Sequence, residues 1–286
     1  MRQFIVEKGK EKNGLIHLEG KDYRYLRQVL RVRAGDMVSV RLPSGDLKNA
    51  TVASIDESAR RVILQVCADT GRTITRGVQA GEIDVAGATG GVNGAAVVEY
   101  WLFQFLPRPQ KFELIVRQAT ECGVAVIVPV AGEYSEKSSV TSLQGAKKER
   151  LERIIKEARQ QSGSPVDTKV LEPVSLEKAI ELWNEACGAA GVENADGTSV
   201  GFVLSERDDC SGNLRATVQK AGGIEKIKKA AIAVGSEGGI SPEEVKLLEE
   251  KGLFVPVHFA VNILRCETAA LYGIAAVQSE IQGGVI

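Results

Sequence analysis

The sequence is poor in the side chains that build metal centres and disulfide frameworks. Its 286 residues include only two histidines, His17 and His258, and five cysteines, none of which belongs to a Cys-x-x-Cys pair. The histidine count excludes a three-histidine metal site, and the cysteine spacing argues against zinc or disulfide scaffolds. Isolated thiols are typical of a reducing compartment, so we expect a cytoplasmic protein that binds no metal.

Long hydrophobic runs and an excess of one charge are also missing. The most apolar stretch, near residues 95–106, is interrupted by Glu99 and is shorter than the roughly 20 residues that cross a bilayer. The first residues, MRQFIVEKGKEK, lack the apolar core of a signal peptide. The net charge is −1, so a surface that binds nucleic acid has to be a local patch. We expect an ordinary globular chain in solution, with no membrane partner.

Residues 1–70 predict a small β-barrel with one helix. Short β-rich segments are separated by polar turns, and a helical pattern over residues 22–30 interrupts them. Arg24, Arg27 and Arg31 share a helical face by their spacing, and Arg33 follows. This strip suits contacts to RNA phosphates, and it equally suits a solvated helix face.

Residues 98–286 predict an α/β domain. After a glycine-rich insertion at 71–97, strands and helices alternate, and the strand segments are VVEYWLFQFL, VAVIVPV, TKVLE, SVGFVLS, AAIAV and LFVPV. This alternation predicts a mostly parallel sheet that is covered by helices on both faces.

A glycine-rich loop follows the segment AAIAV. It reads Gly-Ser-Glu-Gly-Gly at 235–239, and a helix begins after it with Ser241 and Glu244 as a capping box. Ligands bind at the carboxyl ends of parallel strands, where glycines allow close approach to the backbone. Glu237 opposes phosphate and suits hydroxyls or a cation, which S-adenosylmethionine offers. A tight turn without a ligand is the alternative, whereas the missing Gly-x-Gly-x-x-Gly pattern argues against a phosphate-binding Rossmann enzyme.

A second loop lies before the last helix, after the segment LFVPV. Arg265 and Glu267 stand at the start of that helix, at the sheet edge that also carries the glycine-rich loop. An exposed ion pair in the first helical turn is the alternative. The helix behind them has apolar residues at the spacing of a buried face, namely Leu271, Ile274, Val277 and Ile281.

Several short motifs follow one another in a specific order. They are YLRQVLRVRAGD at 25–36, RQATECGV at 117–124, QSG at 161–163, the segment 234–244, and ILRCETA at 263–269. In this order the chain resembles the 16S ribosomal RNA uridine-N3 methyltransferase family, within the SPOUT class of knotted methyltransferases. The resemblance implies a PUA-like barrel, a domain with a trefoil knot, S-adenosyl-L-methionine as cofactor, small-subunit (16S) ribosomal RNA as partner, and a homodimer.

The resemblance also implies roles for both loops. Arg265 would stabilise charge on a uracil carbonyl oxygen as N3 attacks the methyl group, and Glu267 would take the proton or hold Arg265. The implied cofactor-binding residues are Leu204, Ser205, Gly235, Glu237, Gly238, Gly239, Phe259, Ala260, Ile263 and Leu264.

Four places depart from the family pattern. Ser236 replaces a proline, Ser164 replaces an arginine, FAVN at 259–262 replaces Leu-Gly-x-Arg, and EYS at 133–135 replaces Glu-Arg-Ser. Because three arginine positions are lost, a second hypothesis is a catalytically weakened RNA- or ribosome-binding member of the same fold.

Overall fold

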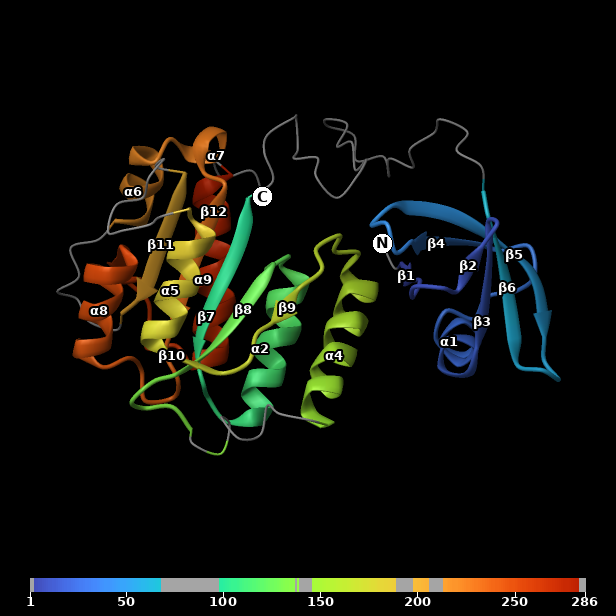
Figure 1. The fold of residues 1–286 in the computed structure, drawn as a ribbon, viewed down its shortest axis with the longest axis horizontal. Coiled ribbons are helices and arrows are strands. Elements are labelled where there is room, and N and C mark those ends of the chain that lie inside the picture. Colours follow the sequence, from blue (N-terminus) through green and yellow to red (C-terminus); the bar gives the residue numbers. More distant parts are fainter. Residues whose placement is uncertain are drawn as a thin grey trace. The chain divides into compact units, whose positions relative to one another are not determined.

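The computed structural model describes residues 3–67, 98–136, 138, 146–188, 198–205 and 213–282. Contacts divide the chain into two compact units, residues 1–94 with 159–165 and residues 95–158 with 166–286. Figure 1 shows the fold of each unit. The insertion expected at 71–97 lies outside the described residues. Within those residues, no helix is both long and apolar enough to cross a membrane.

The N-terminal unit contains a curled six-stranded sheet in the order β1-β4-β5-β6-β3-β2, which confirms the β-rich prediction. In β3, Ile16 and Leu18 are buried while His17 and Glu19 are exposed, the alternation that gives a sheet one apolar face. A register shift after Val52 bends β5 against β6. The strands are β1 (Phe4–Ile5), β2 (Glu11–Lys12), β3 (Leu15–Glu19), β4 (Met37–Arg41), β5 (Leu47–Asp56) and β6 (Arg61–Val66).

The helix expected over 22–30 is a short α-helix, α1 (Gly20–Arg24), followed by a π-helical turn, η1 (Tyr25–Val29). Because a π turn takes in an extra residue, and because Arg31 lies beyond it with a φ of 54°, the arginines do not share one helical face. That part of the prediction was wrong. Arg27 is also engaged, since it donates to Val32 O and pairs with Glu57 at 2.7 Å. Arg24, Arg31 and Arg33 are exposed, and their RNA-binding role stays a prediction.

The C-terminal unit contains a parallel sheet in the order β10-β8-β7-β12-β11-β13, with β9 paired to β8. Every pairing among these strands in the described residues is parallel, as the alternation predicted. The central strand β12 is buried over most of its length, which explains its continuous apolar sequence. The strands are β7 (Glu99–Phe105), β8 (Val126–Ala131), β9 (Lys169–Val170), β10 (Val174–Ser175), β11 (Ser199–Leu204), β12 (Lys229–Val234) and β13 (Phe254–Val257).

Helices cover both faces of this sheet (Figure 1). In one apolar core α2 and α9 bury Ile115 and Ile274, and in the other α5 and α8 bury Trp183 and Leu248. The strand order does not define the threading of the chain, so the trefoil knot stays a prediction. The helices are α2 (Pro109–Glu121), α4 (Ala146–Ser162), α5 (Leu176–Ala186), α6 (Leu214–Lys220), α7 (Gly223–Lys226), α8 (Pro242–Gly252) and α9 (Cys266–Ile281).

Candidate active site

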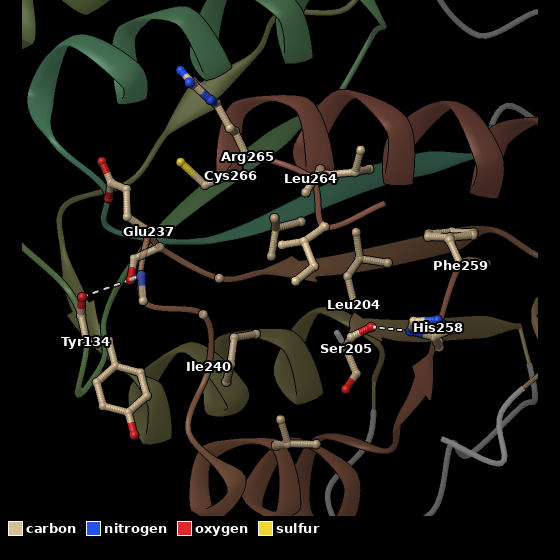
Figure 2. Close-up of a pocket in the computed structure, with 18 of the residues that line it drawn as sticks. Tyr134, Leu204, Ser205, Glu237, Ile240, His258, Phe259, Leu264, Arg265 and Cys266 are labelled. Carbon is tan, nitrogen blue, oxygen red and sulfur yellow. Dashed lines mark hydrogen bonds between the residues drawn. The ribbon is translucent and has the colours of Figure 1, made fainter. Parts of the chain in front are cut away.

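Four adjacent strands bring their carboxyl ends to one edge of the parallel sheet. β7 leads into α2, β11 into Ser205, β12 into the glycine-rich loop 235–239, and β13 into the loop 258–265. A cavity of about 810 Å³ is lined by residues of all these segments, and Figure 2 shows many of the side chains that line it. This is the edge at which open α/β sheets bind ligands.

The glycines of the 235–239 loop are required by the turn itself. Gly239 has a φ of 80°, and a Cβ on Gly235 would lie 2.6 Å from the carbonyl carbon of Gly239. A Cβ on Gly238 would lie 2.8 Å from Cβ of Tyr134. The alternative interpretation, a tight turn that requires these glycines, is therefore correct for the backbone. The cavity beside the loop, rather than the glycines, is the observation that points to a ligand.

Ser236, which stands where the family has proline, anchors the loop by hydrogen bonds. Its buried Oγ donates to Tyr134 O at 2.8 Å and accepts from Gly238 N at 3.3 Å. From β7, Gln104 Nε2 donates to Gly235 O at 3.0 Å. The serine thus restrains the turn by a different means from a proline ring.

The predicted capping box at the start of α8 is confirmed. Ser241 Oγ accepts from Glu244 N at 3.4 Å, and Glu244 Oε2 accepts from Ser241 N at 2.9 Å. Glu244 Oε1 also accepts from Glu133 N at 2.7 Å. The far end of the glycine-rich loop is therefore fixed to α8 and to the segment after β8.

Most of the predicted cofactor residues line the cavity. Ala260 is the exception, because it is exposed and lies outside the cavity lining. Figure 2 shows Glu237 and Cys266 toward one end and His258 with Phe259 toward the other. The predicted residues that line the cavity are Leu204, Ser205, Gly235, Glu237, Gly238, Gly239, Phe259, Ile263 and Leu264.

Arg265 and Glu267 do not form the ion pair that the sequence allowed. Arg265 is the exposed N-cap of α9 and lines the cavity, and its guanidinium makes no hydrogen bond or ion pair with any described residue. Glu267 instead lies 3.4 Å from Lys111 Nζ and accepts from Cys266 Sγ at 3.2 Å. The expectation that Glu267 holds Arg265 was therefore wrong, because Glu267 turns toward α2.

Lys111 is the site residue that sequence reasoning missed. Its Nζ lies 3.3 Å from Glu237 Oε1, 3.4 Å from Glu267 Oε2 and 3.9 Å from Cys266 Sγ. The backbone N–H of Arg108 also donates to Glu237 Oε1, at 3.3 Å. The sequence does show that Lys111 lies at the start of a helix that directly follows a buried strand. Only the pairing of β7 with β12, which the sequence does not reveal, places this helix start beside the glycine-rich loop.

The charges of this cluster stabilise one another. Burial lowers the pKa of the Lys111 ammonium, but Cys266, Glu237 and Glu267 outweigh burial and raise it. Burial favours a higher pKa for Glu267, but its own backbone amide, Cys266 and Lys111 hold that pKa below its usual value. Burial, with Glu267 and Glu237 nearby, raises the pKa of the Cys266 thiol to about 12. Near neutral pH the lysine is charged, Glu267 is ionised and the thiol is neutral.

The fold and the cavity together define an α/β protein with a cofactor-sized site at the carboxyl edge of its parallel sheet. Residues 95–278 match the family model described as the RNA methyltransferase domain, and the chain therefore belongs to this family. This confirms the resemblance that the motifs indicated.

Individual relatives agree with the family. The chain is 31% identical over 159 residues to ribosomal RNA small subunit methyltransferase E of Aquifex aeolicus, a match that spans 56% of this chain and 58% of that protein. It is 26% identical over 190 residues to the Bacillus subtilis protein of the same name, across 65% and 69% of the two chains. The crystal structure of the Neisseria gonorrhoeae protein, bound to S-adenosyl methionine, shares the fold at a TM-score of 0.69 and 20% identity, covering 98% of this chain and 97% of that chain.

Proposed function

We propose that this protein transfers a methyl group from S-adenosylmethionine to N3 of a uridine in the RNA of the small (16S) ribosomal subunit. The observation that carries the proposal is the cavity in which the glycine-rich loop and an unpaired arginine meet. The names of the relatives support ribosomal RNA of the small subunit as the substrate. The choice of uridine N3 rests on the motif resemblance.

The residues of the cavity suit S-adenosylmethionine. The volume of the cavity falls within the range of about 300–1,000 Å³ that is usual for small-molecule sites. Leu204, Ile240 and Leu264 offer apolar surface for a purine ring. Glu237 is anchored through Oε1, while Oε2 makes no hydrogen bond to a described residue and suits a ligand hydroxyl or amine. When bound, the cofactor supplies an electrophilic methyl group.

Arg265 is placed to make uridine reactive. The N3–H of uracil is a weak acid, so N3 becomes a good nucleophile as negative charge moves onto the neighbouring carbonyl oxygens. A guanidinium without a partner at the edge of the cavity can stabilise that charge and lower the effective pKa of N3. Glu267 is a poor base here, because Oε2 already faces two donors and its pKa is lowered. Its proposed role is to orient Lys111.

The weakened, non-catalytic alternative is not favoured. Its motivation was the departures from the family pattern, yet Ser236 still anchors the loop and Arg265 still lines the cavity. The relatives that match this chain are named as methyltransferases, which supports the enzyme.

The proposal includes a homodimer and two domain roles. Exposed apolar side chains gather on α2, on α9 and on the loop between β13 and α9: Leu114 (41% exposed), Val261 (45%), Ile263 (80%) and Tyr272 (41%). Such a surface suits a second copy of the chain. We assign RNA binding to the unit of residues 1–70, catalysis to residues 98–286, and the site of action to the cytoplasm, where ribosomal RNA is found.

Mass mapping of ribosomal RNA tests this function. Small-subunit RNA from cells with and without the gene would be digested and its fragments compared, and a single uridine-containing fragment should lose 14 Da in the deletion. Purified protein should also bind S-adenosylhomocysteine in a calorimeter. Identical RNA masses together with no heat of binding would refute the proposal.

A further inference from the structure

Lys111 belongs to neither of the two loops, yet its ammonium group lies between them. Nζ is 3.3 Å from Glu237 in the glycine-rich loop and 3.4 Å from Glu267 in the first turn of α9. Cys266 Sγ lies 3.9 Å away. Because an ammonium has three donor hydrogens, one lysine can bind all three groups at once. A side chain of α2 therefore connects the cofactor loop to the helix that begins at the arginine.

Without this cation the two carboxylates would face each other. Both lie close to one nitrogen, so their nearest oxygens are at most about 7 Å apart, a distance at which like charges repel. Their side chains are only 33% and 16% exposed, which limits screening by water. Arg265 does not neutralise these carboxylates in place of Lys111, because it pairs with neither of them.

We propose that Lys111 is a positioning residue of the active site, which holds Glu237 and Glu267 together and so sets the glycine-rich loop and the start of α9 in the arrangement that methyl transfer needs. The inference rests on the methyltransferase function proposed above. Glu237, fixed through Oε1, presents Oε2 to the ligand. Arg265, two residues before Glu267, is the N-cap of the same helix, so its position depends on how the start of α9 is held.

The test compares Lys111→Met and Lys111→Arg with the wild-type protein. The matched control is Lys178→Met, which removes a lysine that pairs with Glu181 at 2.8 Å on the exposed face of α5. Tritium-methyl transfer to small-subunit RNA gives kcat across pH. Hydrogen exchange of the unliganded protein reports on the backbone amides of residues 235–239 and 266–270. Lys111→Gln replaces Lys111→Met if the methionine variant fails to fold.

We expect Lys111→Met to lower kcat about 10–100-fold, the usual effect of a small displacement of reacting groups. Exchange in both segments should accelerate about 10-fold, while Lys178→Met leaves both quantities unchanged. In the wild type, protonation of Glu267 breaks its pair with Lys111 and should give kcat an acid limb. Lys111→Met has no such pair to break, so this limb should be lost. Lys111→Arg, which keeps the charge, should recover a large part of the rate.

If the salt bridge were purely structural, Lys111→Met would lower the unfolding temperature and keep the acid limb of kcat, and that result would overturn the inference. Wild-type turnover in Lys111→Met, or an arginine variant no better than methionine, would also overturn it. The proposed function fails separately, if the wild-type protein neither binds S-adenosylhomocysteine nor methylates the RNA.

Discussion

Arg265 occupies a position that helix energetics disfavour for a cation. It is the N-cap of α9, where the positive end of the helix dipole opposes a positive charge, and its side chain makes no capping hydrogen bond. A serine or aspartate there would stabilise the helix better. The proposed function gives a reason for the arginine, because a uracil in the cavity becomes negatively charged when N3 loses its proton.

Replacement of this arginine should separate chemistry from binding. We expect Arg265→Ala to lower methyl transfer about 100–1,000-fold, the usual cost of losing one donor to a developing oxyanion. Affinity for S-adenosylhomocysteine should change little, and the unfolding temperature should stay constant or rise slightly. Tritium transfer, calorimetry and thermal unfolding measure these quantities, with Arg153→Ala as the control for loss of an exposed arginine. Near-normal turnover would remove Arg265 from the mechanism.

The sequence identified Arg265 and Glu267 but not the partner of Glu267. Arg265 and Glu267 are two residues apart, and positions two apart on a helix do not face each other. The acid therefore turns to Lys111, which is more than 150 residues away in the chain. Pairings of this kind depend on strand order, which hydrophobic periodicity does not contain.

The glycine-rich loop is a rigid turn whose backbone shapes one wall of the cavity. A methyl group on Gly235 would meet the backbone of Gly239 rather than a flexible side chain, so the turn itself would have to move. That movement would carry Glu237 away from Lys111 and Arg108.

We therefore expect Gly235→Ala to weaken S-adenosylhomocysteine binding at least about 10-fold, with a loss of roughly 1–3 kcal/mol in the free energy of unfolding. Calorimetry and urea unfolding measure the two effects. A variant that binds as tightly as wild type would mean that the loop does not contact the cofactor.

Periodicity predicted most strands and helices of the fold because each buries one face or one stripe. Periodicity failed where the backbone conformation of one or two residues changes the course of an element. The π turn of η1 takes in one more residue than the sequence pattern implies, and Gly222, with a φ of 90°, divides the helix expected before β12 into α6 and α7. The two-residue strands β2 and β10 are too short to show an alternation.

At the scale of the full chain, the net charge and the local charge lead to different expectations about RNA binding. The net charge of −1 does not attract RNA, whereas Arg24, Arg31 and Arg33 are exposed near α1 and η1. Positive φ at Arg31 directs this part of the chain away from a regular helix. In the proposed function, the N-terminal unit binds RNA and the C-terminal unit binds the cofactor.

A double variant, Arg31→Ala with Arg33→Ala, should weaken RNA binding without affecting the cofactor. Each lost phosphate contact lowers the slope of log affinity against log salt by about 1, so we expect a slope smaller by about 2. Filter binding at several salt concentrations measures the slope, and calorimetry with S-adenosylhomocysteine should be unchanged. Lys246→Ala, on the exposed face of α8, is the control. An unchanged slope would place the RNA surface elsewhere.

Cys266 bears on the chemical stability of the protein under the proposed function. A thiolate is a strong nucleophile, and a sulfur that lines the cavity beside an activated methyl group would be expected to react with it. With a pKa of about 12, the Cys266 thiol stays protonated at neutral pH. Burial, together with the acids that hold Lys111, thus protects the protein from alkylating itself. Intact-mass spectrometry after prolonged incubation with the cofactor should find the chain unmodified, and a mass gain at Cys266 would contradict this protection.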